Sequence, residues 1–417
     1  MIWMDTVYSL NIRHLDALLA ISRMGNMSAA AVEVSLSQPA LAHAVGKMED
    51  TLNGRLFARH PTGVTPTEAG VRFIARVGRA LRYLTRGISQ VRRPARMQAI
   101  ANIERRITMG QLRALVSVVS ASSYAAAAAE VGVSQPALHR AMRELQEVTQ
   151  VPMLVRVGRS VRPTDAAAKL VYFVRLMLAE LAAGIDEMLP VDGEAAGHIR
   201  IGVLPVARAH FLPQVLARFC IEHPGASIEV IEGPYMELLS RLRHGEMDLL
   251  IGSERQSVPA RDVRQEGLFD DELVIVGGAS HPLRGTSKPS ITALLQYPWV
   301  VPARGVPMRL NWERMFQDRG KEPPPLKVQC ASVMIMRGLM LEGDWLTLMS
   351  RDQFRLESRA GTLVEIGSPG PGFWRRIAMT RRIEWQPTRL QSSFVALLKQ
   401  MAAQKANLRQ PDGSGAI

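Results

Sequence analysis

An internal repeat in the first half of the chain restricts what that half can fold into. Residues 14–41 align without a gap over residues 111–138, at a constant offset of 97, and 13 of the 28 aligned pairs are identical. The same offset pairs Arg59 with Arg156 further along the chain. A register kept this long is hard to attribute to alanine-rich composition, so we predict two copies of one folding unit.

Each copy is predicted to begin with two short helices. In the first copy, Leu15, Leu18 and Leu19 follow the spacing of one helix face. Ser28 is placed to cap the next helix, which starts with the small residues 29–31. Small residues allow two helices to approach closely, so we expect these helices to pack together.

A third helix follows a tight turn in each copy. Ser37 and Ser134 are its predicted N-caps, and Pro39 and Pro136 lie in its first turn, where a missing N–H costs nothing. Helix, short turn and helix make up the helix-turn-helix arrangement, in which the second helix presents its N-terminal residues to the major groove of DNA. The repeat therefore points to two DNA-reading units.

Two further elements are predicted after each third helix. In the first copy, residues 56–59 and 63–65 resemble two short strands joined by a turn, which would form a wing. Long helices are predicted over residues 71–90 and 166–189, each with an apolar stripe. Such a stripe is either core or a contact with a second chain, and we favour dimerisation through it.

Charge supports a polyanionic partner for the first half. Residues 1–190 carry 23 Lys and Arg against 14 Asp and Glu, a net charge of +9, whereas residues 191–417 carry 28 against 24, a net charge of +4. Cations near phosphates release condensed counterions, which favours DNA binding. A generic basic surface is the alternative, and charge alone does not decide between them.

The first copy resembles the DNA-binding domain of LysR-type transcriptional regulators. The family pattern matches the tract SQPALAHAVGKMEDTLNGRLFARHPTGVTPTEAG, and the second copy gives a weaker match in SQPALHRAMRELQEVTQVPMLVRVGRSVRPTDAA. The resemblance implies two winged helix-turn-helix domains, mainly α-helical, followed by an α/β two-lobed effector domain of the periplasmic-binding-protein type. The expected division is: domain one at 10–70, linker helix and connector at 71–106, domain two at 107–167, a second linker helix at 168–190, and the effector domain at 197–405, with lobe I at 197–276 and 351–405 and lobe II at 277–350.

The second copy departs from the family pattern at several positions. Val151 and Ala167 stand where the first copy has Gly54 and Gly70, which puts a tight turn and a close packing in doubt. The first copy in turn has Thr62 where the second has Arg159. It is therefore open whether both copies contact DNA or the second is a dimerisation or spacer module.

The resemblance also implies roles for individual side chains. Gln38 and Gln135 are expected to read base edges, because an amide pairs bidentately with adenine. Serines, threonines and basic residues around them suit phosphates, which position a protein on DNA without reading sequence. The full expected DNA-binding set is Ser28, Ser37, Gln38, Pro39, His43, Lys47, Arg59, Thr65, Ser134, Gln135, Pro136, His139, Arg140, Arg156, Arg159 and Arg162.

The second half of the chain alternates predicted strands and helices. Strands are expected at 198–203, 227–232, 248–252, 272–276, 345–349 and 376–380, with helices near 210–222, 235–244, 308–319 and 387–403. Alternation of this kind favours parallel sheets flanked by helices. Residues 190–197 form the predicted polar linker that precedes this half.

In open parallel sheets, ligands bind beyond the carboxyl ends of the strands. Applied to the two lobes, this rule selects an effector site, and its arginines could clamp an anion because guanidinium binds carboxylate bidentately. An organic acid or a sugar derivative is the expected effector. The selected residues are Pro205, Val206, Arg208, Glu232, Gly233, Ser253, Pro302, Ala303, Arg304, Arg309 and, from the resemblance, Ser332.

Other functional classes find little support in the sequence. No signal peptide, membrane span, metal-ligand spacing or catalytic motif is recognised, so we expect a cytoplasmic protein without cofactor or metal that is not an enzyme. The alternative is a solute-binding or enzymatic α/β domain whose helical half mediates protein association. The expected partners are promoter DNA, a small-molecule effector, RNA polymerase, and further copies of the chain in a homodimer or homotetramer.

Overall fold

The computed structural model describes residues 2–61, 63–95, 100, 102–157, 160–189, 197–207, 209–286 and 288–407. Thr62, Arg159, Arg208 and nearly all of the predicted linker at 190–197 lie outside these residues, and the side chains of Arg156 and Val206 are not described. No helix in the described part of the chain combines the length and hydropathy that crossing a bilayer requires.

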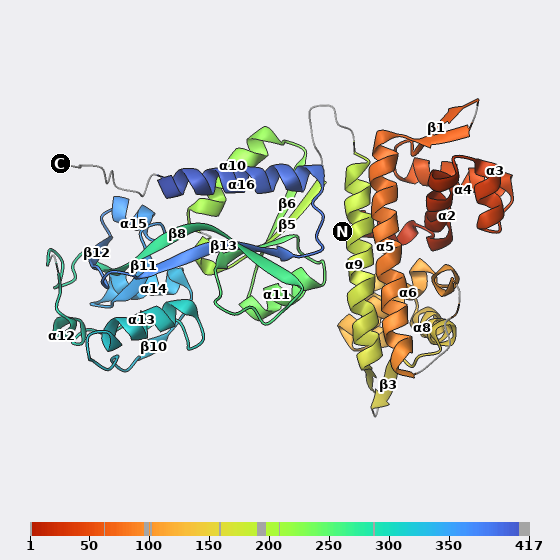
Figure 1. The fold of residues 1–417 in the computed structure, drawn as a ribbon. Coiled ribbons are helices and arrows are strands. Elements are labelled where there is room, and N and C mark those ends of the chain that lie inside the picture. The colour runs from red at the N-terminus through yellow and green to blue at the C-terminus, as the bar shows by residue number, and fades with distance from the viewer. Residues whose placement is uncertain are drawn as a thin grey trace.

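The first half contains two segments with the same order of elements (Figure 1). Each has three helices, a two-stranded antiparallel hairpin and a long helix. The first segment consists of α2 (Ile12–Met24), α3 (Met27–Glu33), α4 (Gln38–Thr51), β1 (Phe57–His60), β2 (Gly63–Pro66) and α5 (Glu68–Arg92), preceded by α1 (Ile2–Ser9). The second consists of α6 (Met109–Ala121), α7 (Tyr124–Val131), α8 (Gln135–Thr149), β3 (Leu154–Val157), β4 (Ser160–Pro163) and α9 (Asp165–Glu187), preceded by the 3₁₀ turn η2 (Ile103–Arg106).

The two segments share hydrogen bonds at positions 97 residues apart. Glu49 Oε1 accepts the N–H groups of residues 56 and 57, and Gln146 Oε1 accepts those of residues 153 and 154. Thr67 and Thr164 each cap the following long helix and donate a side-chain hydrogen bond back to the chain before the hairpin. Glu49 in the first segment and Gln146 in the second thus fix the hairpin to the third helix in the same way.

Left-handed backbone also recurs at this offset. It explains how the second segment can have Val151 where the first has Gly54. Asn53 (φ 49°) and its counterpart Gln150 (φ 56°) carry the turn after the third helix, so neither Gly54 nor Val151 needs a positive φ. Ala167, the counterpart of Gly70, is fully buried, and the backbone bond that closes the packing there has the same 2.9 Å length in both segments. The turn and this hydrogen bond are therefore kept in the second segment, but a Cβ on Gly70 would lie 2.0 Å from the carbonyl oxygen of Leu56, so the backbone around Ala167 must be less closely packed.

The long helices α5 and α9 pack on each other within the chain. They run antiparallel, since residues near 87 meet residues near 173 and residues near 76 meet residues near 184. Their apolar stripes belong to one core shared by both segments. The expectation that these stripes meet a second chain is therefore wrong for α5 and α9 here, because each helix supplies the cover that the other needs.

The second half is built on one mixed sheet, which differs from the parallel sheets predicted. Strands β5 and β6, and β5 and β7, are parallel, but β13 runs antiparallel to both β7 and β8. In the described residues the sheet order is β11-β8-β13-β7-β5-β6, with β12 also on β8. The strands are β5 (Gly197–Val203), β6 (Ala226–Glu232), β7 (Leu249–Ser253), β8 (Val263–Gly278), β11 (Thr347–Ser350), β12 (Leu363–Gly367) and β13 (Trp374–Arg382). The helices are α10 (Phe211–Glu222), α11 (Tyr235–Arg243), α12 (Ile291–Leu294), α13 (Pro307–Gln317), α14 (Val333–Glu342), α15 (Arg355–Arg359) and α16 (Arg389–Asn407), and a parallel pair is formed by β9 (Val300–Val301) and β10 (Val328–Gln329).

Hydrophobic clusters divide this half into two lobes at boundaries other than those predicted. The 16-residue strand β8 enters the second lobe within its length, because Leu273 packs with the core of that lobe. Phe354, Leu363 and Phe373 also pack there, although the sequence prediction placed 351–373 in the first lobe. The return to the first lobe thus comes with β13. The prediction missed β12 and the first half of β8, whose residues alternate too weakly in hydropathy to indicate a strand.

Candidate nucleic-acid interface and effector site

The N-terminal tip of α4 is exposed. Ser37 caps the helix, since its side chain accepts the N–H of Ala40, and Gln38 is exposed in the first turn. Ser28 Oγ donates to Gln38 Oε1 at 2.8 Å and so orients the amide. Ser28 does not cap α3 as predicted, because Asn26 occupies the cap and accepts two backbone N–H groups.

The tip of α8 is built in the same way. Ser134 accepts the N–H of Ala137, and Gln135 is exposed. His139 stacks on Tyr124 of α7, with ring centroids 3.7 Å apart, and this contact fixes where the imidazole points. The free N–H groups at both helix tips are suited to an anion such as a phosphate.

The next turn of each helix carries charge, but the two helices differ there. In α4, His43 and Lys47 are exposed. At the equivalent positions α8 has Arg140 and Glu144, which form an ion pair at 2.8 Å. The hydrogen bond between them raises the pKa of Arg140 and lowers the pKa of Glu144. The first helix therefore carries an exposed lysine here, whereas the cation of the second helix is paired with a carboxylate.

The hairpins place further predicted residues at the surface. Arg59 is exposed on β1, and Thr65 on β2 pairs with His60 through a 2.9 Å contact between Oγ1 and Nε2. Arg162 is exposed on β4. In Figure 1 the hairpins lie toward opposite ends of the α5–α9 pair, and helices α3, α4 and α8 lie on the side away from the second half.

The predicted effector residues follow strand ends as expected. Pro205 follows β5, Glu232 ends β6 and Ser253 ends β7, and since β5 is parallel to β6 and β7 these residues share one edge of the sheet. In the second lobe, Pro302 directly follows β9, and Ser332 is the N-cap residue of α14. Gly233, Ala303 and Arg304 lie in the loops after β6 and β9, where Ala303 and Arg304 are exposed.

An arginine outside the predicted effector set connects the two lobes. Arg255, just after β7, donates from Nη1 to the carbonyl oxygen of Gly305 at 3.2 Å and lies over the ring of Tyr235. Within the described residues, Arg255 Nε and Tyr235 Oη are buried and have no hydrogen-bond partner. Its position two residues beyond the strand end was the only sequence signal for it.

Arg309 lies in a different environment from the one predicted. It is buried, its Nε donates to Glu313 at 2.7 Å, and its guanidinium lies over Trp312 in the core of the second lobe. The neighbouring aromatic core, rather than an open surface, holds this side chain. Of the predicted arginine clamp, Arg304 is the exposed member among the described residues.

The second half docks on the helix pair through the segment between β13 and α16. Arg76 of α5 donates to the carbonyl oxygens of Gln386 and Pro387 at 2.7 and 3.0 Å. His198 at the start of β5 contacts Asp186 of α9 at 3.0 Å, and this hydrogen bond raises the pKa of His198. These contacts connect the lobes physically to both long helices.

Comparison with known proteins agrees with both halves of this arrangement. The model "LysR substrate binding domain" matches residues 192–403, just over half of the chain. The model "Bacterial regulatory helix-turn-helix protein, lysR family" matches residues 12–71 and again residues 109–168. The HTH-type transcriptional regulator GalR of Pseudomonas putida is 26% identical over 396 residues, which cover 95% of this chain and 98% of GalR. The regulator PcaQ of Agrobacterium fabrum is 24% identical and covers 72% of this chain and 97% of its own.

Solved structures give the same fold. A full-length OxyR variant from Pseudomonas aeruginosa has a TM-score of 0.53 and 19% identity, covering 71% of this chain and 97% of that one. CbnR, a LysR family transcriptional regulator, has a TM-score of 0.52 and 19% identity, covering 70% and 98%. At these identities the likeness concerns the fold alone. Together with the family matches in both halves, it leads to one conclusion: the chain is a member of the LysR family of bacterial transcriptional regulators.

Proposed function

We propose that both helix-turn-helix segments, products of a duplication, bind promoter DNA, and that Gln38 and Gln135 read bases. The observation that carries the proposal is the exposure of both helix tips, each capped by a serine and each presenting its glutamine to solvent. With this function we propose the domain division 10–70, 71–106, 107–167, 168–190 and 197–405. Action on promoter DNA also fits a cytoplasmic location.

A mobility shift on the promoter region beside the chain's own gene tests DNA binding. Affinity should fall steeply with salt, because phosphate contacts release counterions. Gln38→Ala and Gln135→Ala should each lower specific affinity by roughly tenfold and leave non-specific binding in place. Gln404→Ala, an exposed glutamine on α16, is the matched control. Unchanged affinity in both tip variants would remove the reading role from these residues.

We further propose that a small anionic effector binds between the lobes beside Arg255. The support is a guanidinium that bridges the lobes together with buried donors that lack partners, Arg255 Nε and Tyr235 Oη. A carboxylate would satisfy both donors, and Arg304 would add charge at the rim. Binding there changes the contact between lobes, and it couples to DNA only if the effector prefers one arrangement.

A thermal-shift screen of small organic acids and sugar acids tests the effector site. A ligand that binds the native state raises the melting temperature, and Arg255→Gln should abolish that rise. Arg261→Gln, on an exposed residue that follows the same strand, is the control and should retain it. A rise that persists in Arg255→Gln would place the ligand elsewhere.

A further inference from the structure

The contact between α5 and α9 has the exchange pattern of a two-fold interface, although both helices belong to one chain. A Cβ placed on Gly87 would lie 2.7 Å from Phe173, and one on Gly184 would lie 3.2 Å from Arg76. Gly184 is the counterpart of Gly87, and Phe173 is the counterpart of Arg76, at the offset of 97. Position 87 of each segment therefore meets position 76 of the other, which is the signature of an isologous interface.

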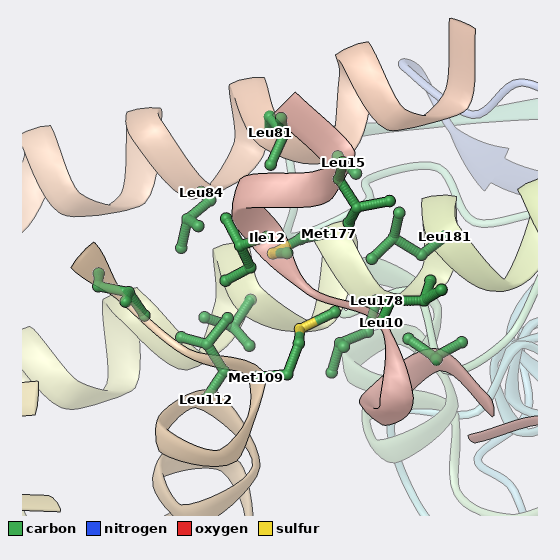
Figure 2. Close-up of a cluster of buried hydrophobic side chains, with 14 of the residues drawn as sticks. Leu10, Ile12, Leu15, Leu81, Leu84, Met109, Leu112, Met177, Leu178 and Leu181 are labelled. Atoms are coloured by element: carbon green, nitrogen blue, oxygen red, sulfur yellow. The ribbon is translucent and has the colours of Figure 1, made fainter. Parts of the chain in front are cut away.

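Figure 2 shows the same relation in the core around the contact. Ile12 and Leu15 of the first segment and their counterparts Met109 and Leu112 belong to one buried cluster, with Leu15 and Leu112 toward opposite sides of it. Leu81 and Leu84 of α5 and their counterparts Leu178 and Leu181 of α9 also belong to this cluster and enter it from different sides. The core is thus a pseudo-symmetric pair of segments, arranged as two copies of one protein would be.

The elements that precede each segment are exchanged as well. Asp5 of α1, which precedes the first segment, pairs with Arg113 of the second at 3.1 Å. Arg105 of η2, which precedes the second segment, pairs with Asp16 of the first at 2.7 Å. Arg113 is the counterpart of Asp16, and Arg105 lies three residues beyond Asn102, the counterpart of Asp5, so the two pairs lie in similar places with their charges reversed.

The buried charges between α5 and α9 are also unequally divided between the two helices. Arg76 lies 3.2 Å from Glu180 and 3.5 Å from Glu187, and all three side chains are buried. The counterparts of the two glutamates in α5 are Tyr83 and Gln90, and the counterpart of Arg76 in α9 is Phe173. The cations are on one helix and the carboxylates on the other.

Pairing between like segments of two chains would lose these contacts. Two first segments would bring Asp5 against Asp16 and leave Arg76 without a carboxylate at positions 83 and 90. Two second segments would bring Arg105 against Arg113 and face Glu180 with Phe173. Like charges and unpaired buried charges are costly, so the sequence disfavours both alternatives.

We propose that this division of charge commits the two segments to pair with each other inside one chain. A single chain then carries both DNA-binding heads, meaning the two helix-turn-helix segments with α4 and α8 as their recognition helices. This rests on the proposed DNA-binding function. The two heads differ on their reading faces, with His43 and Lys47 on α4 against Arg140 and Glu144 on α8. Its ligand is therefore a DNA element with two unlike half-sites, one per head, rather than a palindrome.

Cross-linking of the full-length chain tests the pairing without any DNA. In a background with Cys220→Ser and Cys330→Ser, we would introduce Asp5→Cys with Arg113→Cys, and separately Asp16→Cys with Arg105→Cys. Both pairs lie near the surface, so folding should survive. A short bismaleimide should link each pair within one chain, giving a single-chain species on a denaturing gel and the linked peptides by mass spectrometry.

Asp5→Cys with Asp16→Cys is the matched control, since pairing of two first segments would join two chains through it. We expect no covalent dimer from this control and an internal link from both test pairs. A covalent dimer from the control, a covalent dimer from either test pair, or no link in either test pair would overturn the proposal.

Affinity selection from a randomised duplex pool with the full-length protein tests the DNA consequence. We expect enriched sites with two unlike halves, and enriched palindromes would overturn that consequence. The absence of any enriched sequence, with internal links still formed, would refute the DNA-binding function and leave the pairing in place. The two arms therefore fail in different ways.

Discussion

The two helix-turn-helix segments have nearly the same backbone but different charges, and the contrast separates what sets the fold from what sets the partner. Hairpin anchors, helix caps and left-handed turns recur 97 residues apart even where the residue type changes, as with Glu49 and Gln146. The charges at the α5–α9 contact and on the reading helices do not recur. The backbone fold thus accommodates the differences in residue type between the segments. The charges decide which segment pairs with which and how each helix meets DNA.

The largest expected effect comes from making the buried contact symmetric. Arg76→Phe gives the first segment the residue that the second carries, and it leaves Glu180 and Glu187 with fewer partners and two carbonyl oxygens unpaired. Removing one partner of a buried ion pair costs about 3 kcal/mol or more. Chemical denaturation of the full chain should show a loss of this order in the free energy of unfolding.

Arg82→Ala is the control for that change, because it also gives α5 the residue found in α9, but at an exposed position. It should alter the free energy of unfolding by less than about 0.5 kcal/mol. Equal effects of the two variants would mean that the buried charges do not specify the pairing.

A smaller effect is expected when the second reading helix is given the charge of the first. Glu144→Lys places a cation where the first segment has Lys47, and it releases Arg140 from its ion pair. Affinity for DNA should rise by up to about tenfold at low salt, and the plot of log affinity against log salt should steepen by about one unit. Titrations at several salt concentrations measure both, and a weaker complex would show that α8 does not lie near phosphates.

Helix caps should give an effect of about 1 kcal/mol. Asn26→Ala removes the cap of α3 and Ser123→Ala removes the equivalent cap of α7, so both should lower the free energy of unfolding by this amount. Ser28→Ala should leave stability nearly unchanged, because Ser28 instead orients Gln38. A large loss of stability in Ser28→Ala would show that Ser28, and not Asn26, caps α3.

The smallest effect depends on pH. The hydrogen bond to Asp186 raises the pKa of His198 in the folded chain, so the charged pair stabilises the contact at low pH and is lost as pH rises through the raised pKa. Because His198 is about two-fifths exposed (41%), the contribution should be a few tenths of a kcal/mol. The melting temperature of the wild type should exceed that of His198→Gln more at about pH 6 than at about pH 8.5, and the opposite trend would exclude this contact as the cause.

The sequence predicted the helical half well, because the repeat doubled every local signal. Caps such as Ser37, the buried face of each third helix and the hairpins are local features, and the structure has them where expected. The cap of α3 was misassigned, since Asn26 and Ser28 are both good caps and only the backbone bonds distinguish them. That α5 would cover α9 in the same chain could not be predicted, because an apolar stripe does not identify its partner.

The second half was less predictable because its contacts are distant in sequence. Strand β8 serves both lobes, and its first half is defined by pairing with β13, about 110 residues later. The lobe boundaries depend on Phe354 and Phe373 packing across the chain. Arg255 was missed because its interest arises from meeting Gly305 and Tyr235, which no local pattern indicates.

Hydroxyl-radical footprinting of the full chain on a selected duplex is the most direct test that one chain reads DNA with both heads. Gln38→Ala should weaken protection in one half of the footprint and Gln135→Ala in the other half, each by roughly tenfold in the concentration required. If each variant weakens both halves equally, the two heads in one footprint are copies of the same segment from different chains, and the account is contradicted.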